Sequence, residues 1–347
     1  MSAWHHHSDL LDICQRVNIE HDRIVFAGEE FLVEPASGDL SRTQLLDTLT
    51  GRIYKGFYIR PELGRENQPN SSEWATRTSD SIQTDIADLV AQLKIANGTH
   101  TSWDPGWEIY HFGNDGRAYV KRADQSRIAW AGTYMLDNWM GAGAKVGDIV
   151  KLKVFPYTEA PLDSFFHTFG TTLSDQFEEY KLLRFYFNIE SSRVVALLQF
   201  LSKQLNYYFV PYHFKALADP ATYGRADAAV LYVASCHYQI VAYLLTRLPD
   251  ILGDGLRSGV PMFTREFARG IGAAQDPGKG ASFGMHRCGL VALALLKANA
   301  NGIFNCDGKM ALIEQCFSDV GIDLNTPYLN SGEFDLFAQP LFVGGVE

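Results

Sequence analysis

Residues 183–233, LRFYFNIESSRVVALLQFLSKQLNYYFVPYHFKALADPATYGRADAAVLYV, decide the fold that this sequence predicts. Apolar residues recur at every second position over 183–189. An arginine, a tyrosine and an asparagine stand between them, which is typical of a half-buried strand. Valines and leucines then recur at helical spacing over 194–205, and Ser191 or Ser192 can cap that helix. The segment therefore begins with a strand followed by an amphipathic helix.

The second half of this segment predicts two more strands. On the first, His213 and Lys215 share one face, opposite Tyr212 and Phe214. The second, residues 228–233, is almost continuously apolar, as a buried strand is. This strand–helix–strand–strand unit predicts an α+β fold, with an antiparallel or mixed sheet flanked by helices. Its polar positions are Arg, Tyr, His and Lys, which suit a site better than a core.

The composition excludes several classes of protein. The chain has 347 residues, enough for one large domain or two modest ones. With 46% hydrophobic and 20% charged residues it is globular and not disordered. Its net charge of −10 argues against a nucleic-acid binder. A cluster of arginines and lysines in so acidic a chain therefore requires a local explanation.

The cysteines and the first residues indicate a cytoplasmic protein. Five cysteines occur without a CxxC pair, which is typical of reduced thiols. His5, His6 and His7 stand near the start, where a signal peptide would carry an apolar run. The longest apolar helix, near residues 290–296, is too short to span a bilayer. We expect a cytoplasmic location, with neither a membrane nor a nucleic-acid partner.

The periodicity of the chain changes near residue 104. Residues 1–104 are expected to be mainly helical, and residues 105–347 to contain the remaining elements, with both parts packed as one compact body. Apolar spacing of three and four predicts helices in the first part over 9–17, 42–58 and 79–95.

Alternating residues after Trp107 predict a small antiparallel sheet. Residues 107–113 and 117–122 flank Asn114-Asp115-Gly116 and indicate a β-hairpin, and residues 149–155 indicate another strand. Further along the chain we expect a polar loop over 167–175 and helices over 237–248 and 309–317.

A glycine-rich run, DPGKGASFGMHR over residues 276–287, precedes a predicted core helix. Ser282 is expected to cap this helix, and the free backbone N–H groups at a helix start favour anions. Lys279, His286 and Arg287 add positive charge there. The alternative is a flexible connector followed by a buried helix.

Three other groups of charged residues can be explained without a functional role. Arg265 and Arg269 lie four residues apart and are predicted to share a helix face, where a neighbouring glutamate can pair with one of them. Arg225 lies two residues before Asp227, so a loop ion pair accounts for both. Lys215 can extend its amine into solvent. Their coincidence around one structural unit is what favours a site.

The absence of common motifs narrows the chemistry. The sequence has no HExxH, no CxxC, no GxSxG, no GxGxxG after a strand and no kinase catalytic loop. A reaction that needs neither metal nor cofactor remains, and β-elimination of phosphate from phosphoserine or phosphothreonine is one. In that reaction a neutral Lys removes the Cα proton, Arg residues hold the phosphate, and a Tyr or His protonates the leaving oxygen.

Six segments resemble the HopA-one family, which is named for a bacterial type III secreted effector. They are HTFGTTLSDQ (167–176), LRFYFNIE (183–190), FKALADPATYGRADAAVLYV (214–233), PMFTRE (261–266), DPGKGASFGMHRC (276–288) and DLNTPYLN (323–330). In gene clusters for class V lanthipeptides and thioamitides, HopA-one-like proteins resemble the lyase half of a pair. A separate phosphotransferase phosphorylates Ser and Thr of a precursor peptide, and the HopA-one-like protein eliminates the phosphate to leave dehydroalanine and dehydrobutyrine.

The resemblance implies that residues 105–347 form a HopA-one-like lyase domain, a carbon–oxygen lyase without a cofactor. It also implies a phosphorylated precursor peptide as substrate and a kinase-like phosphotransferase as heterodimer partner. It also implies a core like that of phosphothreonine lyases, which carry a Lys-x-His strand, a helix and then a strand with the Lys base. Arg184 and Tyr186 stand where that Lys and His would be, and Lys215 stands where the base would be. Because this strand has no His, the acid is Tyr186, His213 or His286.

The site predicted in this way has two groups of residues. Lys215 is the base, with Tyr186, His286 and His213 as the other catalytic residues, and no metal site is expected. The predicted phosphate-binding residues are Arg184, Arg225, Arg265, Arg287, Lys279 and Ser282. The alternatives are a non-catalytic module that binds a phosphopeptide, a leader peptide or a kinase, and a secreted effector recognised by a host.

Overall fold

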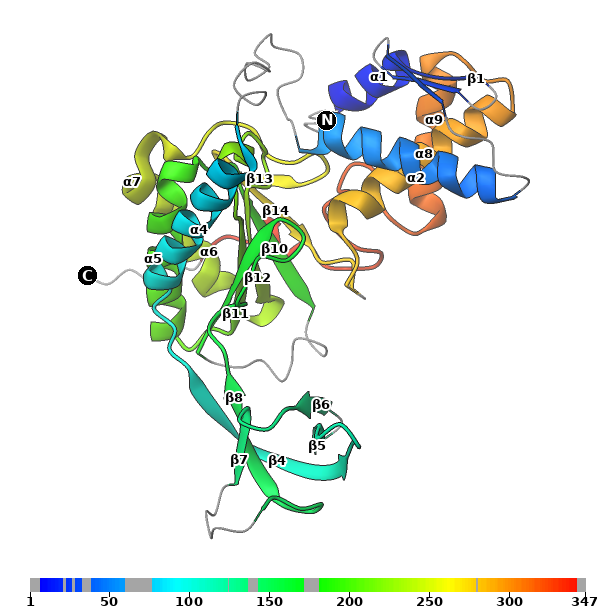
Figure 1. The fold of residues 1–347 in the computed structure, drawn as a ribbon. Coiled ribbons are helices and arrows are strands. Elements are labelled where there is room, and N and C mark those ends of the chain that lie inside the picture. The colour runs from blue at the N-terminus through cyan, green and yellow to red at the C-terminus, as the bar shows by residue number, and fades with distance from the viewer. Residues whose placement is uncertain are drawn as a thin grey trace.

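The computed structural model describes residues 7–20, 23–26, 29–32, 39–59, 77–123, 125–136, 143–171, 181–278 and 280–341. Figure 1 shows three groups of elements: a central sheet with helices along one side, a helical group that joins N-terminal residues to residues 283–319, and a small sheet that projects from the centre. Antiparallel sheets flanked by helices confirm the predicted α+β class.

The central sheet consists of β9 (Phe165–Phe169), β10 (Leu182–Phe187), β11 (Tyr212–Leu217), β12 (Ala229–Ala234), β13 (Arg265–Ala268) and β14 (Ile271–Gln275). The strands are ordered β13-β14-β10-β12-β11-β9, and every neighbouring pair is antiparallel. Strands β10, β11 and β12 lie where alternation predicted them. The polar loop predicted over 167–175 is wrong at its start, because residues 167–169 belong to β9.

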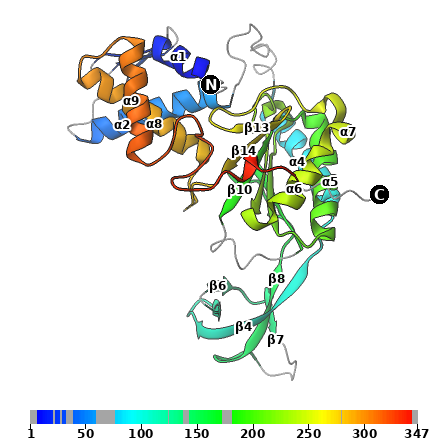
Figure 2. The same ribbon diagram turned by 180° about the vertical axis from the view of Figure 1, so that it is seen from behind.

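Helices cover one side of the central sheet, as Figures 1 and 2 show. They are α4 (Ser79–Ala96), α5 (Ser191–Tyr207), α6 (Tyr238–Thr246) and α7 (Leu248–Leu252). The predicted cap of α5 at Ser191 or Ser192 is wrong. The N-cap is Glu190, and both serines already lie inside the first turn. Short 3-10 turns are η2 (Pro220–Thr222), η3 (Ser235–His237), η4 (Gly253–Gly255) and η5 (Leu336–Ala338).

The helical group joins N-terminal residues to residues 283–319. It contains α1 (His7–Arg16), α2 (Asp39–Ile53), the π-helical turn η1 (Tyr54–Tyr58), α8 (Phe283–Ala300), α9 (Cys306–Asp319) and a sheet of β1 (Val17–Glu20), β2 (Arg23–Phe26) and β3 (Glu29–Leu32). Helix α1 packs on α9 and α2 packs on α8. The ranges 1–104 and 105–347 therefore share one hydrophobic core.

The helices predicted in residues 1–104 are confirmed by α1, α2 with η1, and α4. Strands β1 to β3 were not predicted, because four residues are too few for a two-residue period to stand out. The predicted cap at Ser282 is confirmed, since its side-chain oxygen accepts a hydrogen bond from the backbone N–H of Met285 at 3.4 Å. The helix predicted over 309–317 is α9.

The predicted helix face shared by Arg265 and Arg269 is wrong. Arg265 begins strand β13, which turns back into β14 through Gly270. Gly270 has φ of 70°, and a Cβ there would lie 2.3 Å from the carbonyl oxygen of Arg257. Only glycine fits this position, so the segment forms a hairpin and not a helix.

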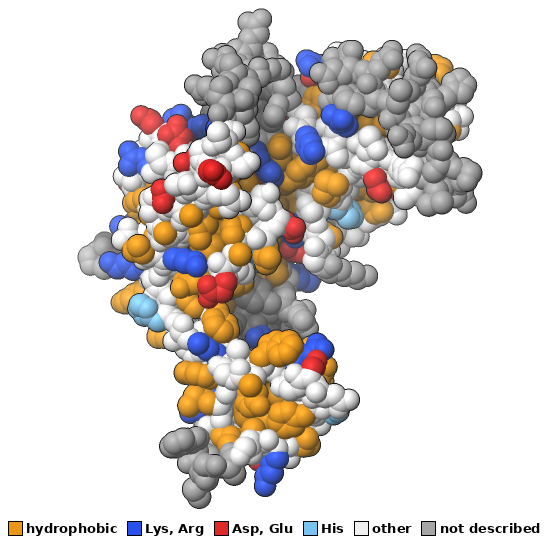
Figure 3. All heavy atoms as spheres, in the orientation of Figure 1, with side chains coloured by type: hydrophobic (Ala, Val, Ile, Leu, Met, Phe, Trp, Pro, Cys, Tyr) orange, Lys and Arg blue, Asp and Glu red, His pale blue; other side chains and the backbone are white. Residues whose placement is uncertain are grey.

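The small sheet has its own core. Its strands are β4 (Ser102–Phe112), β5 (Ala118–Arg122), β6 (Gln125–Ala129), β7 (Tyr134–Leu136) and β8 (Ile149–Val154), in the order β6-β5-β4-β8-β7. The hairpin of β4 and β5 confirms the prediction around Asn114-Asp115-Gly116. Trp107, Ile109 and Val150 form a core separate from the main one. Apolar side chains also gather on the visible face of this sheet (Figure 3).

Candidate functional site

One face of the central sheet is polar. The antiparallel registers place Arg184 opposite Tyr232 and Tyr232 opposite His213, while Lys215 lies opposite His167. Cross-strand partners share a face, so these side chains point the same way. We call this the polar face and define it by His167, Arg184, Tyr186, His213, Lys215 and Tyr232. The opposite face carries the buried apolar residues Phe185, Phe187, Phe214, Leu231 and Val233.

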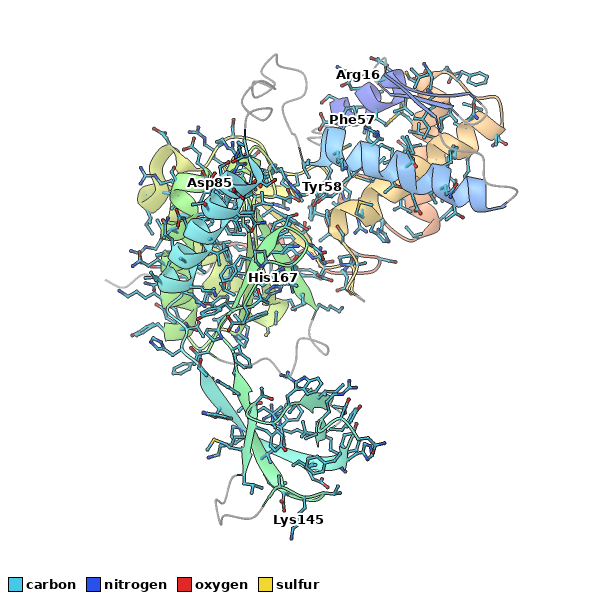
Figure 4. All side chains as sticks on the ribbon, in the orientation of Figure 1. Arg16, Phe57, Tyr58, Asp85, Lys145 and His167 are labelled. Carbon is cyan, nitrogen blue, oxygen red and sulfur yellow. The ribbon has the colours of Figure 1, made fainter. Side chains whose placement is uncertain are left out.

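Aromatic rings stack across the polar face. His213 stacks on Tyr232 with ring centroids 4.9 Å apart and on His167 with centroids 5.0 Å apart. Phe169 stacks on His213 at the same distance of 5.0 Å. Figure 4 labels His167, which lies on β9, the last strand of the central sheet. The stack lies across β9, β11 and β12, so it depends on their pairing.

The two histidines of the stack form a hydrogen bond. His167 Nδ1 and His213 Nε2 lie 2.8 Å apart, so one ring donates and the other accepts. Burial, together with the neighbouring His167, Lys215 and Arg184, lowers the pKa of His213 to about 3. Burial and Lys215 also lower the pKa of His167. The pair is therefore neutral at pH 7.

We expect the free energy of unfolding to fall as the pH drops below 6.5, the ordinary pKa of histidine. The unfolded chain then binds protons at both histidines, while folded His213 stays neutral until the pH approaches about 3. Chemical denaturation over this pH range measures the effect. His213→Phe should flatten the profile, and His100→Phe, at an exposed position, should not. An identical profile in His213→Phe would contradict the lowered pKa.

Lys215 lies between two aromatic rings. Its Nζ is 4.5 Å from the ring centroid of Phe165 and 5.7 Å from that of Tyr232. Among the described residues it has no carboxylate and no hydrogen-bond partner. An unpaired amine on a half-buried face is unusual in an acidic chain, because lysines that leave solvent normally pair.

Two arginines flank Lys215 across these rings. The guanidinium carbon of Arg184 lies 5.1 Å from the Tyr232 centroid, and that of Arg225 lies 5.6 Å from the Phe165 centroid. We call Arg184, Lys215 and Arg225 the cation row. The sequence placed these three residues in one site, and the structure brings them together through the two rings.

Both arginines of the cation row are also held by carboxylates. Arg184 Nε donates to Asp276 at 2.5 Å, and its Nη2 donates to the carbonyl oxygen of Ala281 at 2.7 Å. Arg225 donates twice to Asp227, at 2.8 and 2.9 Å, as the alternative of a loop ion pair predicted. Burial opposes both charges, but the surrounding acidic and phenolic groups outweigh it and raise both pKa values.

Tyr186 is fully buried beside the cation row. Its ring lies edge-on to Tyr58 and tilted against Phe283. Its hydroxyl makes no hydrogen bond to a described residue. Burial raises the pKa of this phenol, and Arg184 offsets only part of the rise. Tyr186 and Lys215 lie two strands apart, on either side of Val230, so their backbones are about 10 Å apart.

The glycine-rich run contacts the cation row through Asp276 and the carbonyl oxygen of Ala281, but Arg287 and His286 make other contacts. Arg287 is fully buried and donates to the carbonyl oxygens of Pro327 and Leu329, so it holds the 327–330 loop. Burial lowers its pKa to about 10. His286 is exposed and contacts Arg287. Ser282 caps α8, and Lys279 lies outside the described residues.

Arg265 lies on the opposite face of the sheet. It pairs across β14 with Ala273, which in turn lies opposite Phe185. Its guanidinium donates to Asp335 at 3.1 Å and to Tyr328 at 3.2 Å. The structure therefore separates Arg265 from the predicted phosphate site.

We expect Arg265→Gln to leave any activity at the polar face unchanged. The substitution removes a partly exposed ion pair, so the free energy of unfolding should fall by about 1 kcal/mol or less. Activity assays and urea denaturation test this directly. A loss of activity in a variant with an unchanged unfolding midpoint would return Arg265 to the site.

Sequence reasoning missed His167 and Tyr232 as members of the polar face. The alternation FFHTF over residues 165–169 contained a signal for His167, but the segment was interpreted as a loop. Tyr232 lies within an apolar run, AVLYVA, where no alternation marks a face. Only the pairing of β12 with β10 and β11 reveals its direction.

Other kinds of site find no support in the part of the chain that the structure describes. Within it, no group of three His, Cys, Asp or Glu side chains has a metal-binding arrangement. No helix there combines the length and hydrophobicity needed to cross a membrane. The five cysteines are unpaired.

Comparisons with known proteins bear on the same region. The model of the HopA1 effector protein family matches residues 161–329, which contain all six strands of the central sheet. Two solved structures are similar, effector proteins from Pseudomonas syringae pv. tomato strain DC3000 and pv. syringae strain 61. The first is 13% identical with a TM-score of 0.43 and covers 83% of this chain and 99% of its own. The second is 13% identical with a TM-score of 0.41 and covers 83% and 97%. No curated protein matches the chain. The strand–helix–strand–strand unit lies inside the matched range, so the chain is similar to the HopA1 effector protein family over residues 161–329.

Proposed function

We propose that this protein is a phosphoserine and phosphothreonine lyase that acts on a phosphorylated peptide. The observation that carries the proposal is Lys215, an amine without a carboxylate partner among the described residues, placed between Arg184 and Arg225 on a polar sheet face. A general base needs a free lone pair, so its amine must not be held in an ion pair with a carboxylate. A dianionic leaving group needs cations nearby. The cation row supplies both.

In the proposed reaction Lys215, in its neutral form, takes the Cα proton of the phosphorylated residue. The electrons of that bond form the Cα–Cβ double bond, and the Cβ–O bond breaks with its electrons leaving on phosphate. The products are dehydroalanine or dehydrobutyrine, inorganic phosphate and a protonated lysine. Arg184 and Arg225 stabilise the charge that develops on the leaving oxygen. No oxidant or co-reactant is required.

The proton for the leaving phosphate has two candidate sources. A dianion bound beside the His167–His213 pair favours its protonated form, and that imidazolium can return a proton to the phosphate. The Tyr186 phenol keeps its proton because burial raises its pKa, but it lies two strands from Lys215. His286 is exposed, and its hydrogen bond among the described residues is with Arg287 and not with the cation row. We therefore favour the histidine pair.

The proposal includes partners and a location. The substrate is a precursor peptide phosphorylated on Ser or Thr, and a separate kinase-like phosphotransferase, paired with this chain as a heterodimer, supplies the phosphate. The unpaired cysteines agree with a reducing cytoplasm.

A second candidate is a module that binds a phosphopeptide without turnover. The observation that favours it is the pairing of Arg184 with Asp276 and of Arg225 with Asp227, because each guanidinium already interacts with a carboxylate. An arginine that is already paired with a carboxylate can still help to bind a phosphopeptide, but it is less suited to stabilise the charge of a transition state.

Mass spectrometry of a synthetic phosphoserine peptide separates the two candidates. Elimination removes one phosphoric acid from each site, and the product adds a thiol at the new double bond. Binding changes no mass. If the purified protein, alone and with its phosphotransferase, leaves the peptide mass unchanged while it retains the peptide, the lyase proposal fails and the binding module stands.

A further inference from the structure

A groove lies between the small sheet and the central sheet, next to the polar face. Its volume is about 670 Å³, and both sheets contribute to its lining. Its lining includes His213 and Tyr232 of the polar face. The groove therefore leads from solvent to the stacked rings beside the cation row.

The outer wall of the groove is the edge of strand β6. Arg127, Ile128 and Ala129 are consecutive, and all three line the groove. Successive side chains of a strand point to opposite faces, so three in a row contact one hollow only where it runs along the strand edge. Strand β6 is the last in its sheet, and among the described residues no strand pairs with its outer side. Such an edge accepts an extended peptide.

The groove is positively charged in an acidic protein. Among the described residues, its lining includes Arg127 and Lys153 but no aspartate or glutamate. Neither cation has a carboxylate partner within the described residues. Arg127 lies 5.0 Å from the ring centroid of Trp107, and Lys153 lies 5.1 Å from that of Phe155. Because the chain carries a net charge of −10, this local positive field favours an acidic ligand over a basic one.

The groove also exposes large apolar side chains. Ile128 and Trp130, which line the groove, are 53% and 52% exposed. Exposed apolar residues beside unpaired cations and a free strand edge suit a peptide that offers both backbone and acidic side chains.

We infer that this groove binds an extended acidic segment of the substrate peptide, as an added strand along β6, and directs the phosphorylated residue toward Lys215. The inference rests on the proposed function for the identity of the peptide. The binding itself does not depend on turnover.

The test is fluorescence anisotropy with a labelled, unphosphorylated peptide that carries a run of glutamates before a serine. Arg127→Ala/Lys153→Ala should weaken its affinity about tenfold, and added salt should reduce the difference between variant and wild type. The matched control is Lys121→Ala/Lys145→Ala, which removes one cation from β5 and one from the segment before β8, both outside the groove. Figure 4 labels Lys145 at the far end of the small sheet. The same peptide with glutamine in place of glutamate should bind more weakly to the wild type.

A second pair of variants tests the strand edge. Ile128→Glu places a negative charge in the groove and should also weaken binding about tenfold, while Ile149→Glu, at an exposed position elsewhere in the sheet, should not. If Arg127→Ala/Lys153→Ala and Ile128→Glu bind the acidic peptide as the wild type does, the inference is overturned. If the wild type binds the peptide but eliminates no phosphate from its phosphorylated form, the groove stands and the lyase proposal fails.

Discussion

Replacing Lys215 by methionine is expected to lower the rate of phosphate elimination by about 10²–10⁴-fold, the usual contribution of a general base. Methionine keeps the apolar stem that packs between Phe165 and Tyr232, so the fold should survive. No other described lysine lies on the polar face to take over the proton. Mass spectrometry of a phosphoserine peptide over time measures the rate, and thermal denaturation verifies folding.

Two controls make the Lys215 result specific. Lys203→Met changes an exposed lysine on α5 and should leave the rate unchanged. Lys215→Arg keeps the positive charge but supplies no neutral base, because guanidinium stays protonated. It should therefore bind a phosphopeptide and fail to eliminate phosphate. Elimination by Lys215→Met at the wild-type rate would remove Lys215 from the mechanism.

Arg184→Met is expected to lower the free energy of unfolding by about 3–5 kcal/mol, because it leaves a buried carboxylate without its partner. Asp276 is only 10% exposed, and the Ala281 carbonyl oxygen loses a donor at the same time. Urea denaturation of the variant measures the change. A loss below 1 kcal/mol would mean that Asp276 finds water or another partner.

The double variant Arg184→Met/Asp276→Asn distinguishes a structural role of Arg184 from a catalytic one. The asparagine oxygen can still accept the backbone N–H of Gly278, which Asp276 accepts at 2.7 Å, and no buried charge remains. Stability should recover in large part. If Arg184 also stabilises the leaving phosphate, the recovered protein should still eliminate slowly. A stable double variant with the wild-type rate would show that the role of Arg184 is structural only.

The relative directions of side chains that share a strand or a turn could be predicted from the sequence. A two-residue period placed Arg184 with Tyr186, and His213 with Lys215, on common faces, and the structure agrees. The Arg225–Asp227 pair and the Ser282 cap also involve residues two or three apart. Predictions of this kind succeed because backbone geometry alone sets the direction of nearby side chains.

The ion-pair and hydrogen-bond partners of Arg184, Arg265 and Arg287 could not be predicted from the sequence. Asp276 lies 92 residues from Arg184, Asp335 lies 70 residues from Arg265, and the carbonyl oxygen of Pro327 lies 40 residues from Arg287. Arg287 looked like an anion ligand because its sequence neighbours are glycines and a histidine. Its backbone partners come from a loop that folds back onto α8.

By itself the sequence determined the α+β class, the positions of β10, α5, β11 and β12, and which of their residues share a face, since the periods of strands and helices are local properties. The tertiary structure alone decided which faces meet. It brought His167 and Tyr232 beside Lys215, moved Arg265 to the far side of the sheet, buried Arg287 in the core, and opened a cationic groove between two sheets. The physical reason is that the pairing of distant strands and the burial of distant charges depend on the whole hydrophobic core, which no short segment specifies.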